Sequence, residues 1–488
     1  MKKIQNIKIV ISASLLFVWL SSCEGILDEQ PYSQLSEEQF WKTQTDVVAG
    51  VAAIYDGMQK TYDNKYYRWG EFRSDNMTRN PSTSTAEILE LLTNSITPTN
   101  SSTLRWDEFY LMISRANLAI ENIPKIAGYD RQLLGEAHAI RAYAYFHAIR
   151  VWGDVPLFTE ALKGFDQQIQ RPRTKASEIL EKVILPDLQT AERLITQNVN
   201  QFRFSKAALW SLQGEVYMYL KDYAKAKTAL TNIVRLNAFS LVTSREAWQR
   251  LFLNDILLGG KSMVGPELIF SIRYDLTDTD RSGVQGIFFS GIPDAYISTR
   301  LENKWTSRFP IDSVSWYRLY PNFQPRTKDA AGRTLFGDWR YFESRESGVA
   351  VGSSRVAKYR KANANIADDT DIHVYRYANT ILLLAEAENQ LGNKDAAVAL
   401  LNQLRTARQL PTVRAADFTS KEQLEDFLLD ERQFELLGEG VRWWDLIRTG
   451  KAVQVMNPIN GQTDKKLLFP IFERHLIDNP LLTQTEGY

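Results

Sequence analysis

The feature of the sequence that most constrains the fold is a pattern of small residues within two neighbouring amphipathic segments. Trp210 is followed by Gly214 and Tyr217, and then by Ala226 and Leu230. Apolar residues recur through both segments with the spacing of an α-helix. Because a glycine and an alanine let two helices approach closely, the pattern predicts a helical hairpin.

This spacing is that of a tetratricopeptide repeat. A second copy runs from Ile381 through Ala385 and Ala397 to Leu401. The segment 107–150 resembles a third, weaker copy. Such hairpins cannot bury their apolar faces alone and must stack on neighbours. Long insertions separate the copies, so we expect the repeats to form a scaffold and the insertions to carry the function.

Periodicity along the rest of the chain predicts a mainly α-helical fold. Helices are expected over 36–59, 106–123, 133–152, 175–196, 205–220, 222–236, 371–391, 394–409 and 421–437. The repeat scaffold is therefore expected at about 36–238 and 371–450. Between these parts, at about 239–370, helical periodicity fades, and an irregular, loop-rich inserted region is predicted.

Aromatic residues are concentrated in the inserted region. The segment 281–345 holds 13 aromatic residues in 65 positions, nearly twice the 11% of the whole chain. Glycine, proline, asparagine, aspartate and serine lie between them, which predicts loops and short hairpins. A second stretch that mixes aromatic and polar residues, Tyr62–Asn80, follows the first expected helix and lacks periodicity.

The first 22 residues have the pattern of a bacterial lipoprotein signal peptide. Three lysines accompany an apolar run of 12 residues, Ile9–Leu20, which is shorter than the ~20 residues that a membrane-spanning helix needs. Leu20-Ser21-Ser22-Cys23 follows and resembles a lipobox, and Cys23 is the only cysteine. We predict a signal peptide over 1–22, lipid attached to Cys23, and a mature domain over 23–488. A chance cysteine after an ordinary signal peptide is the alternative.

Composition and motifs argue against several classes of function. The chain has 58 basic and 58 acidic residues, so no basic surplus exists to neutralise nucleic-acid phosphates. One cysteine, and four histidines without the spacing of a helical metal site, predict neither a metal site nor a cofactor. Catalytic signatures such as Gly-x-Ser-x-Gly and His-Glu-x-x-His are absent, so no enzyme is predicted.

Two acidic patterns remain to be interpreted. Glu431 and Glu435 lie one turn apart on an expected helix beside Arg432, which favours an ion-pair network. A glycosidase carboxylate pair, which leaves no sequence pattern, is the alternative.

Asp278–Gly283 resembles the first half of a calcium loop. Phe289 stands where the bidentate glutamate of such a loop belongs, so we interpret the segment as a solvated turn.

Motifs along the whole chain, in order, resemble those of one family. They are Phe40-Trp41-Lys42-Thr43, Arg141-Ala142-Tyr143, Trp152-Gly153-Asp154-Val155-Pro156-Leu157, Tyr375-Arg376-Tyr377-Ala378 and Arg442-Trp443-Trp444-Asp445-Leu446-Ile447-Arg448. The chain is similar to the SusD/RagB family of outer-membrane lipoproteins from Bacteroidetes. Glu24, Asp28 and Glu29, shortly after the cysteine, resemble the surface-export signal of such lipoproteins.

The resemblance implies a function. Members of the family sit on the cell surface, anchored by lipid to the outer membrane, as lids over a SusC-like TonB-dependent transporter. They bind oligosaccharides, or peptides in the RagB branch, and perform no chemistry. Their ligand sites lie on the face away from the repeats, in variable insertions. Glycan capture is therefore the expected function, with a peptide receptor and, less favoured, a glycoside hydrolase as alternatives.

Candidate ligand residues come from the two aromatic stretches. An aromatic ring can cover the C–H face of a sugar, while arginine, asparagine and aspartate bind its hydroxyls. The Ser74-Asp75 step also resembles a family position near the ligand. Arg376, outside these stretches, opens an expected helix from the side of the site, and a purely structural role is at least as strong an alternative for it. The predicted ligand-binding residues are Tyr67, Trp69, Arg73, Asp75, Asn76, Tyr296, Trp305, Trp316 and Arg376.

Overall fold

The computed structural model describes residues 40–82, 84–162, 169–253, 263–275, 281–289, 293–329, 331–360 and 368–488. The predicted signal peptide and Cys23 lie outside the described residues, as does the first half of the calcium-like turn. In the part of the chain that is described, no helix combines the length and the apolar character needed to cross a membrane.

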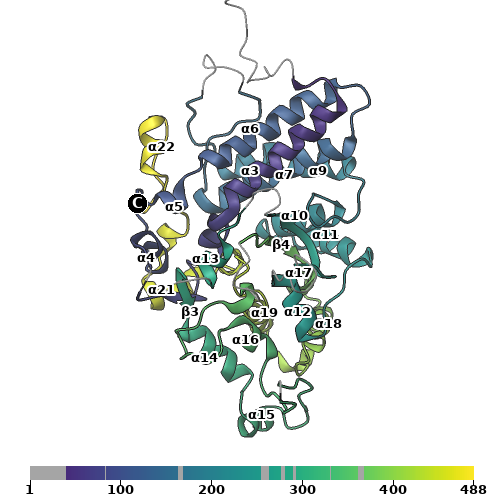
Figure 1. Ribbon diagram of the computed structural model, residues 1–488, viewed down its shortest axis with the longest axis vertical. Coiled ribbons are helices and arrows are strands. Elements are labelled where there is room, and N and C mark those ends of the chain that lie inside the picture. Colours follow the sequence, from purple (N-terminus) through teal and green to yellow (C-terminus); the bar gives the residue numbers. More distant parts are fainter. Residues whose placement is uncertain are drawn as a thin grey trace, which may run out of the picture.

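Four long helices from the first part of the chain lie side by side (Figure 1). They are α3 (Gln44–Gly70), α6 (Asp107–Asn122), α7 (Arg131–Trp152) and α9 (Leu185–Leu194). Helix α3 begins with a capping box, in which the Thr43 side chain accepts from the Asp46 N–H and the Asp46 carboxylate accepts in return. Helix α3 covers most of the helix expected at 36–59, begins at Gln44 and continues beyond the expected end to Gly70.

The aromatic stretch after position 61 belongs largely to α3. The helix bends at Asp63, whose backbone leaves the helical region, and then continues to Gly70. Tyr62, Tyr66 and Trp69 are all buried there. Tyr62 meets His147 of α7 at 5.0 Å between ring centroids. Helical periodicity is invisible in this stretch because almost every side of the helix is buried.

The two predicted repeat hairpins are present. Helix α10 (Lys206–Tyr219) packs on α11 (Tyr223–Arg235), and α17 (Tyr377–Gln390) packs on α18 (Lys394–Ala407). A Cβ added to Gly214 would lie 2.6 Å from Leu230 Cδ2, which confirms the close approach of the first pair. Helix α11 also packs on α17, and α19 (Lys421–Glu435) covers the other hairpin. The copies therefore stack although insertions separate them in sequence.

Two short antiparallel ribbons join distant parts of the chain. Strand β1 (Met77–Arg79) pairs with β3 (Ala295–Ile297), and β2 (Leu268–Ile272) pairs with β4 (Ile372–Arg376). The expected helix over 371–391 is thus wrong at its start, because a fully buried strand precedes α17. Both ribbons tie the inserted region to the scaffold.

The inserted region is built from short helices rather than from the expected loops and hairpins alone. They are α12 (Arg245–Phe252), α13 (Val284–Phe288), α14 (Thr299–Arg308), α15 (Ser313–Leu319) and α16 (Trp339–Ser344). Four of them begin at a serine or aspartate whose side chain accepts a backbone N–H of the first turn. Helices of two or three turns are too short to show a clear period. Helices α14 and α15 form the lower end of the molecule in Figure 1.

The remaining elements are short. They are α4 (Ala86–Leu92), α5 (Ser101–Leu104), α8 (Ala176–Ile179), a π-helical turn (Leu180–Ile184), α20 (Arg442–Arg448), α21 (Ala452–Asn460), α22 (Glu473–Asp478), and 3-10 turns at Ile123–Lys125, Ala357–Tyr359, Ala415–Asp417 and Asp464–Lys466. Helix α8, the π-helical turn and α9 run on from one another, and together they occupy the helix predicted at 175–196.

Candidate ligand-binding site

The two tryptophans predicted to be sugar platforms are core residues. Trp305 on α14 is 1% exposed, and its indole Nε1 donates to Asp338 Oδ2 at 2.9 Å. One face of its ring stacks on Phe434 at 5.0 Å. Trp316 on α15 is fully buried, and its Nε1 donates to the carbonyl oxygen of Phe323 at 3.1 Å. The expectation of exposed rings is therefore wrong for both.

Asp75 and Asn76 belong to a buried polar cluster. Arg442 Nε donates to Asp75 Oδ1 at 2.8 Å, and Gln433 Nε2 donates to Asp75 Oδ2 at 2.9 Å. The same Gln433 amide donates to Asn76 Oδ1 at 2.7 Å. Burial alone would raise the pKa of Asp75, but the Arg442 guanidinium holds it below its usual value. The cluster joins the end of the first aromatic stretch to α19 and α20.

Arg73, Tyr67 and Trp69 are buried as well. The Arg73 guanidinium lies between the rings of Trp443 and Phe469, 4.5 Å from each centroid. It donates to the backbone carbonyls of residues 467 and 468 at 3.2 and 3.1 Å. These contacts of Arg73 hold the C-terminal segment against the scaffold, and all three side chains lie in the interior rather than at an exposed surface.

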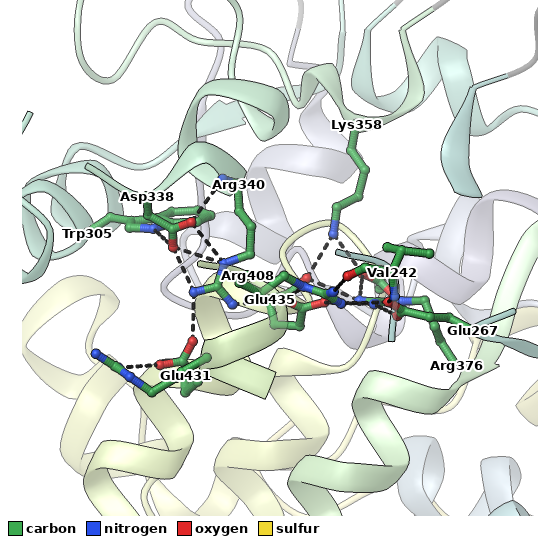
Figure 2. Close-up of polar contacts among 12 residues, drawn as sticks. Val242, Glu267, Trp305, Asp338, Arg340, Lys358, Arg376, Arg408, Glu431 and Glu435 are labelled. Carbon is green, nitrogen blue, oxygen red and sulfur yellow. Dashed lines mark hydrogen bonds and ion pairs between the residues drawn. The ribbon is translucent and has the colours of Figure 1, made fainter. Parts of the chain in front are cut away.

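Arg376 lies in a buried network of charges (Figure 2). Its Nη1 donates to Glu267 Oε2 at 2.6 Å and to Glu435 Oε1 at 2.7 Å. Arg340, on α16, reaches Glu435 Oε2 at 2.8 Å and Glu431 Oε1 at 2.7 Å. The prediction that Glu431 and Glu435 belong to an ion-pair network is confirmed.

The network is balanced in charge. Its members are Lys358, Arg340, Arg376, Arg405, Arg408, Asp338, Glu267, Glu431, Glu435 and Glu439, which gives five cations and five carboxylates. Burial would raise the pKa of Glu435, but three arginines hold it well below its usual value. The network fixes α16 of the inserted region to α19 and to the β2–β4 ribbon.

A solvent-open cavity of about 700 Å3 lies within the inserted region. Its wall comes from α12, the end of α13, α16 and the loop that follows α16. The lining residues are Arg245, Phe289, Phe342, Glu343, Arg345, Glu346, Ser347, Gly348, Ala357 and Arg360. Phe289 and Phe342 are both partly exposed. We call this the inserted-region cavity.

Glu343 organises one side of the inserted-region cavity. Arg245 Nε donates to its Oε1 at 3.0 Å, and Arg360 Nη2 donates to its Oε2 at 2.8 Å. Gln249 donates to Oε2 as well. Burial would raise the pKa of Glu343, but these hydrogen bonds lower it, so the side chain is a carboxylate at neutral pH.

Two lining residues, Phe289 and Glu346, contact Arg355, which is not itself part of the lining. The Arg355 guanidinium lies 4.3 Å from the centroid of the Phe289 ring, and its Nε donates to Glu346 Oε2 at 2.7 Å. Tyr296 on β3 lies opposite Thr78 in the β1–β3 ribbon. Of the nine predicted ligand residues, Tyr296 alone keeps a partly exposed side chain.

The aromatic enrichment includes the two lining residues Phe289 and Phe342, but the sequence analysis did not name either of them as a ligand-binding candidate. Phe342 directly precedes Glu343, and the polar loop Arg345-Glu346-Ser347-Gly348 follows. An aromatic residue beside such a loop is a better sign of a surface ring than a tryptophan inside an amphipathic turn. Phe289 has no comparable signal in the sequence.

A second cavity of about 300 Å3 lies between α6 and α22. It is lined by the rings of Trp106, Tyr110 and Phe158 and by carboxylates that include Asp107 and Glu160. It lies beside the helical scaffold and not in the inserted region. In the described ranges, no group of three or more histidine, cysteine, aspartate or glutamate side chains is arranged to hold a metal ion.

Comparison with known proteins places these observations in a family. Residues 341–488 match a family model described as the SusD family, and residues 26–218 match one described as starch-binding associating with outer membrane. The chain is 46% identical to SusD-like protein P38 of Formosa agariphila, with all of both chains covered. It is 24% identical to SusD-like protein P2 of the same organism, over 99% of this chain and 100% of that protein.

Solved structures share the fold. NanU of B. fragilis superposes with a TM-score of 0.73 at 23% identity, covering 94% of this chain and 99% of that chain. A laminarin-binding SusD-like protein superposes with a TM-score of 0.69 at 21% identity, covering 92% of this chain and 100% of that chain. The identity to P38 over the full length carries the assignment: the chain belongs to the SusD family.

Proposed function

We propose that this protein captures oligosaccharides in the inserted-region cavity and delivers them to a SusC-like TonB-dependent transporter. In this proposal, lipid on Cys23 holds the protein at the outer membrane, facing the cell exterior. Proteins of the SusD family bind ligands and do not catalyse reactions. The proposal therefore includes capture and delivery and no chemical step.

The observation that carries the proposal is the lining of the inserted-region cavity. Phe289 and Phe342 offer partly exposed rings, which suit the C–H face of a sugar. Charged planar groups, such as Arg345 and Glu346, lie around them and suit hydroxyl groups. The volume of about 700 Å3 is large enough for several sugar rings.

Calorimetry against a panel of polysaccharides and peptides tests the proposal. Phe342→Ala should weaken binding of the polysaccharide that wild type binds by roughly tenfold or more, since aromatic stacking contributes ~1–3 kcal/mol. Phe158→Ala, in the second cavity, is the matched control and should bind normally. A loss confined to Phe158→Ala would move the site to the second cavity, and binding of peptides alone would make the protein a peptide receptor.

A further inference from the structure

The wall of the inserted-region cavity carries more positive than negative charge. Among its lining residues, Arg345 pairs with the buried Glu302 at 2.7 Å, and Glu346 pairs with Arg355. These pairs cancel. Arg245 and Arg360 remain, and they share one carboxylate, that of Glu343. Among the residues that the structure describes, one positive charge on the wall is therefore not balanced by the side chains that pair with it.

The hydrogen-bonding groups show the same excess. Both Glu343 oxygens already accept from Arg245, Gln249 and Arg360. Arg345 donates through Nε to Glu302 and through Nη2 to the carbonyl of Val349, and its Nη1 forms no hydrogen bond with a described residue. Arg245 Nη1 donates to the Lys328 carbonyl at 3.4 Å, and Arg360 Nη1 donates to the Glu343 carbonyl at 3.2 Å. Among the contacts of the described residues, Arg345 Nη1 is therefore the donor that the wall leaves for a ligand, while its central acceptor is fully used.

The second cavity does not share this feature. Its described lining includes Asp107, Glu160 and Asp478 but neither lysine nor arginine. Since the chain carries no net charge, a surplus of guanidinium groups at one cavity is not a consequence of overall composition.

From this wall we infer that the inserted-region cavity takes acidic oligosaccharides, whose carboxylate or sulfate groups bind Arg245, Arg345 and Arg360. Guanidinium groups bind such anions through two parallel N–H donors, and they bind them more strongly than neutral hydroxyls. Phe289 and Phe342 would lie against the sugar ring. The inference rests on the proposed function and adds to it the chemical class of the ligand.

Matched pairs of acidic and neutral polysaccharides test the class. The probes are polygalacturonate with its carboxyl-reduced form, and dextran sulfate with unsulfated dextran, measured by affinity electrophoresis and calorimetry. We expect at least one acidic probe to bind, to lose roughly tenfold or more in affinity when neutralised, and to bind more weakly as salt rises. The two pairs distinguish carboxylate from sulfate as the recognised group.

Arginine variants then locate the contact. Arg345→Gln should reduce affinity for the acidic probe by about tenfold, and Arg345→Lys should restore only part of it because the planar fork is lost. Arg414→Gln, at an exposed ion pair with Asp417, is the control and should bind normally. Thermal melting of each variant separates loss of affinity from loss of fold.

The outcomes are distinguishable. Preference for neutral polysaccharides, or binding with equal affinity for the two members of each pair, overturns the inference and leaves the proposed function standing. Binding of the acidic probes that is unchanged in Arg345→Gln and in Arg360→Gln also overturns it. Binding of no polysaccharide, acidic or neutral, contradicts the proposed function itself.

Discussion

Glu71 provides a quantitative test of how this scaffold tolerates a buried acid. It follows α3 and is fully buried, and its Oε1 accepts from Asn76 Nδ2 at 2.7 Å and from the Gly438 N–H at 2.9 Å. Its Oε2 accepts from the Gly440 N–H at 3.0 Å. Burial raises the pKa of Glu71 to about 7, although these hydrogen bonds oppose the shift.

The direction of the pH effect follows from proton binding. Between the unfolded pKa of 4.5 and the folded pKa of about 7, the folded protein holds a proton that the unfolded chain has lost. Stability from this group is therefore fully present below pH 4.5 and is lost as pH rises to about 7. At about 1.4 kcal/mol for each pH unit, the loss totals about 3 kcal/mol.

Glu71→Gln removes the titration and keeps the size of the side chain. We expect the free energy of unfolding of the variant, relative to wild type, to rise by about 3 kcal/mol between pH 4.5 and pH 7.5. Urea denaturation at a series of pH values measures this difference. The titrations of the other buried acids are common to both proteins and do not contribute to it.

Asp75→Asn is the matched control, because the pKa of Asp75 is lowered and not raised. Its wild-type carboxylate stabilises the fold above its unfolded pKa of 3.8 and loses this effect only as pH falls below that value, so the control should be flat between pH 4.5 and pH 7.5 and should show the opposite slope below pH 3.8. Parallel pH profiles for wild type and Glu71→Gln would refute the reasoning. They would mean that the three donors keep Glu71 ionised in the folded protein.

Three further predictions use other parts of the molecule. Trp316→Ala should cost ~3–5 kcal/mol of stability because it empties a buried position. Tyr317→Ala, at a ring that is 37% exposed, should cost much less. Similar melting temperatures for both variants would contradict the burial of Trp316. Cys23→Ala should leave the protein in the soluble fraction, and continued membrane attachment would disprove the lipobox. Purified protein should leave bound oligosaccharides intact in chromatography, and turnover that Glu431→Gln abolishes would identify an enzyme.

The helical scaffold was predictable because its signals are local. Gly214 and Ala226 lie within one hairpin, and the close packing that they permit involves helices adjacent in sequence. The ion pairs of Glu431 and Glu435 were also predictable in kind, because two acids one turn apart beside arginine need partners. Their actual partners, such as Arg340, come from the inserted region and leave no local pattern.

The candidate site was not predictable to the same degree, because burial there depends on distant partners. Asp75 meets Arg442 across 367 residues of sequence, so its neighbours in the chain give no sign that it is buried. Polar neighbours likewise suggest a surface position for Trp305, yet its helix turns the ring onto Phe434. Aromatic enrichment identified the region of the cavity but could not separate its wall from its core.

The buried charge network also bears on how specificity can change in such a chain. None of the side chains that line the inserted-region cavity belongs to the network. Arg340 fixes α16 from inside, while the exposed Ser347 and Gly348 lie a few positions beyond the same helix. In the proposed function, ligand recognition and attachment of the helix are thus encoded by separate residues only a few positions apart. Loop exchange at 346–348 between related proteins, with Arg345 kept as the partner of the buried Glu302, should therefore transfer ligand preference without redesign of the helices beneath.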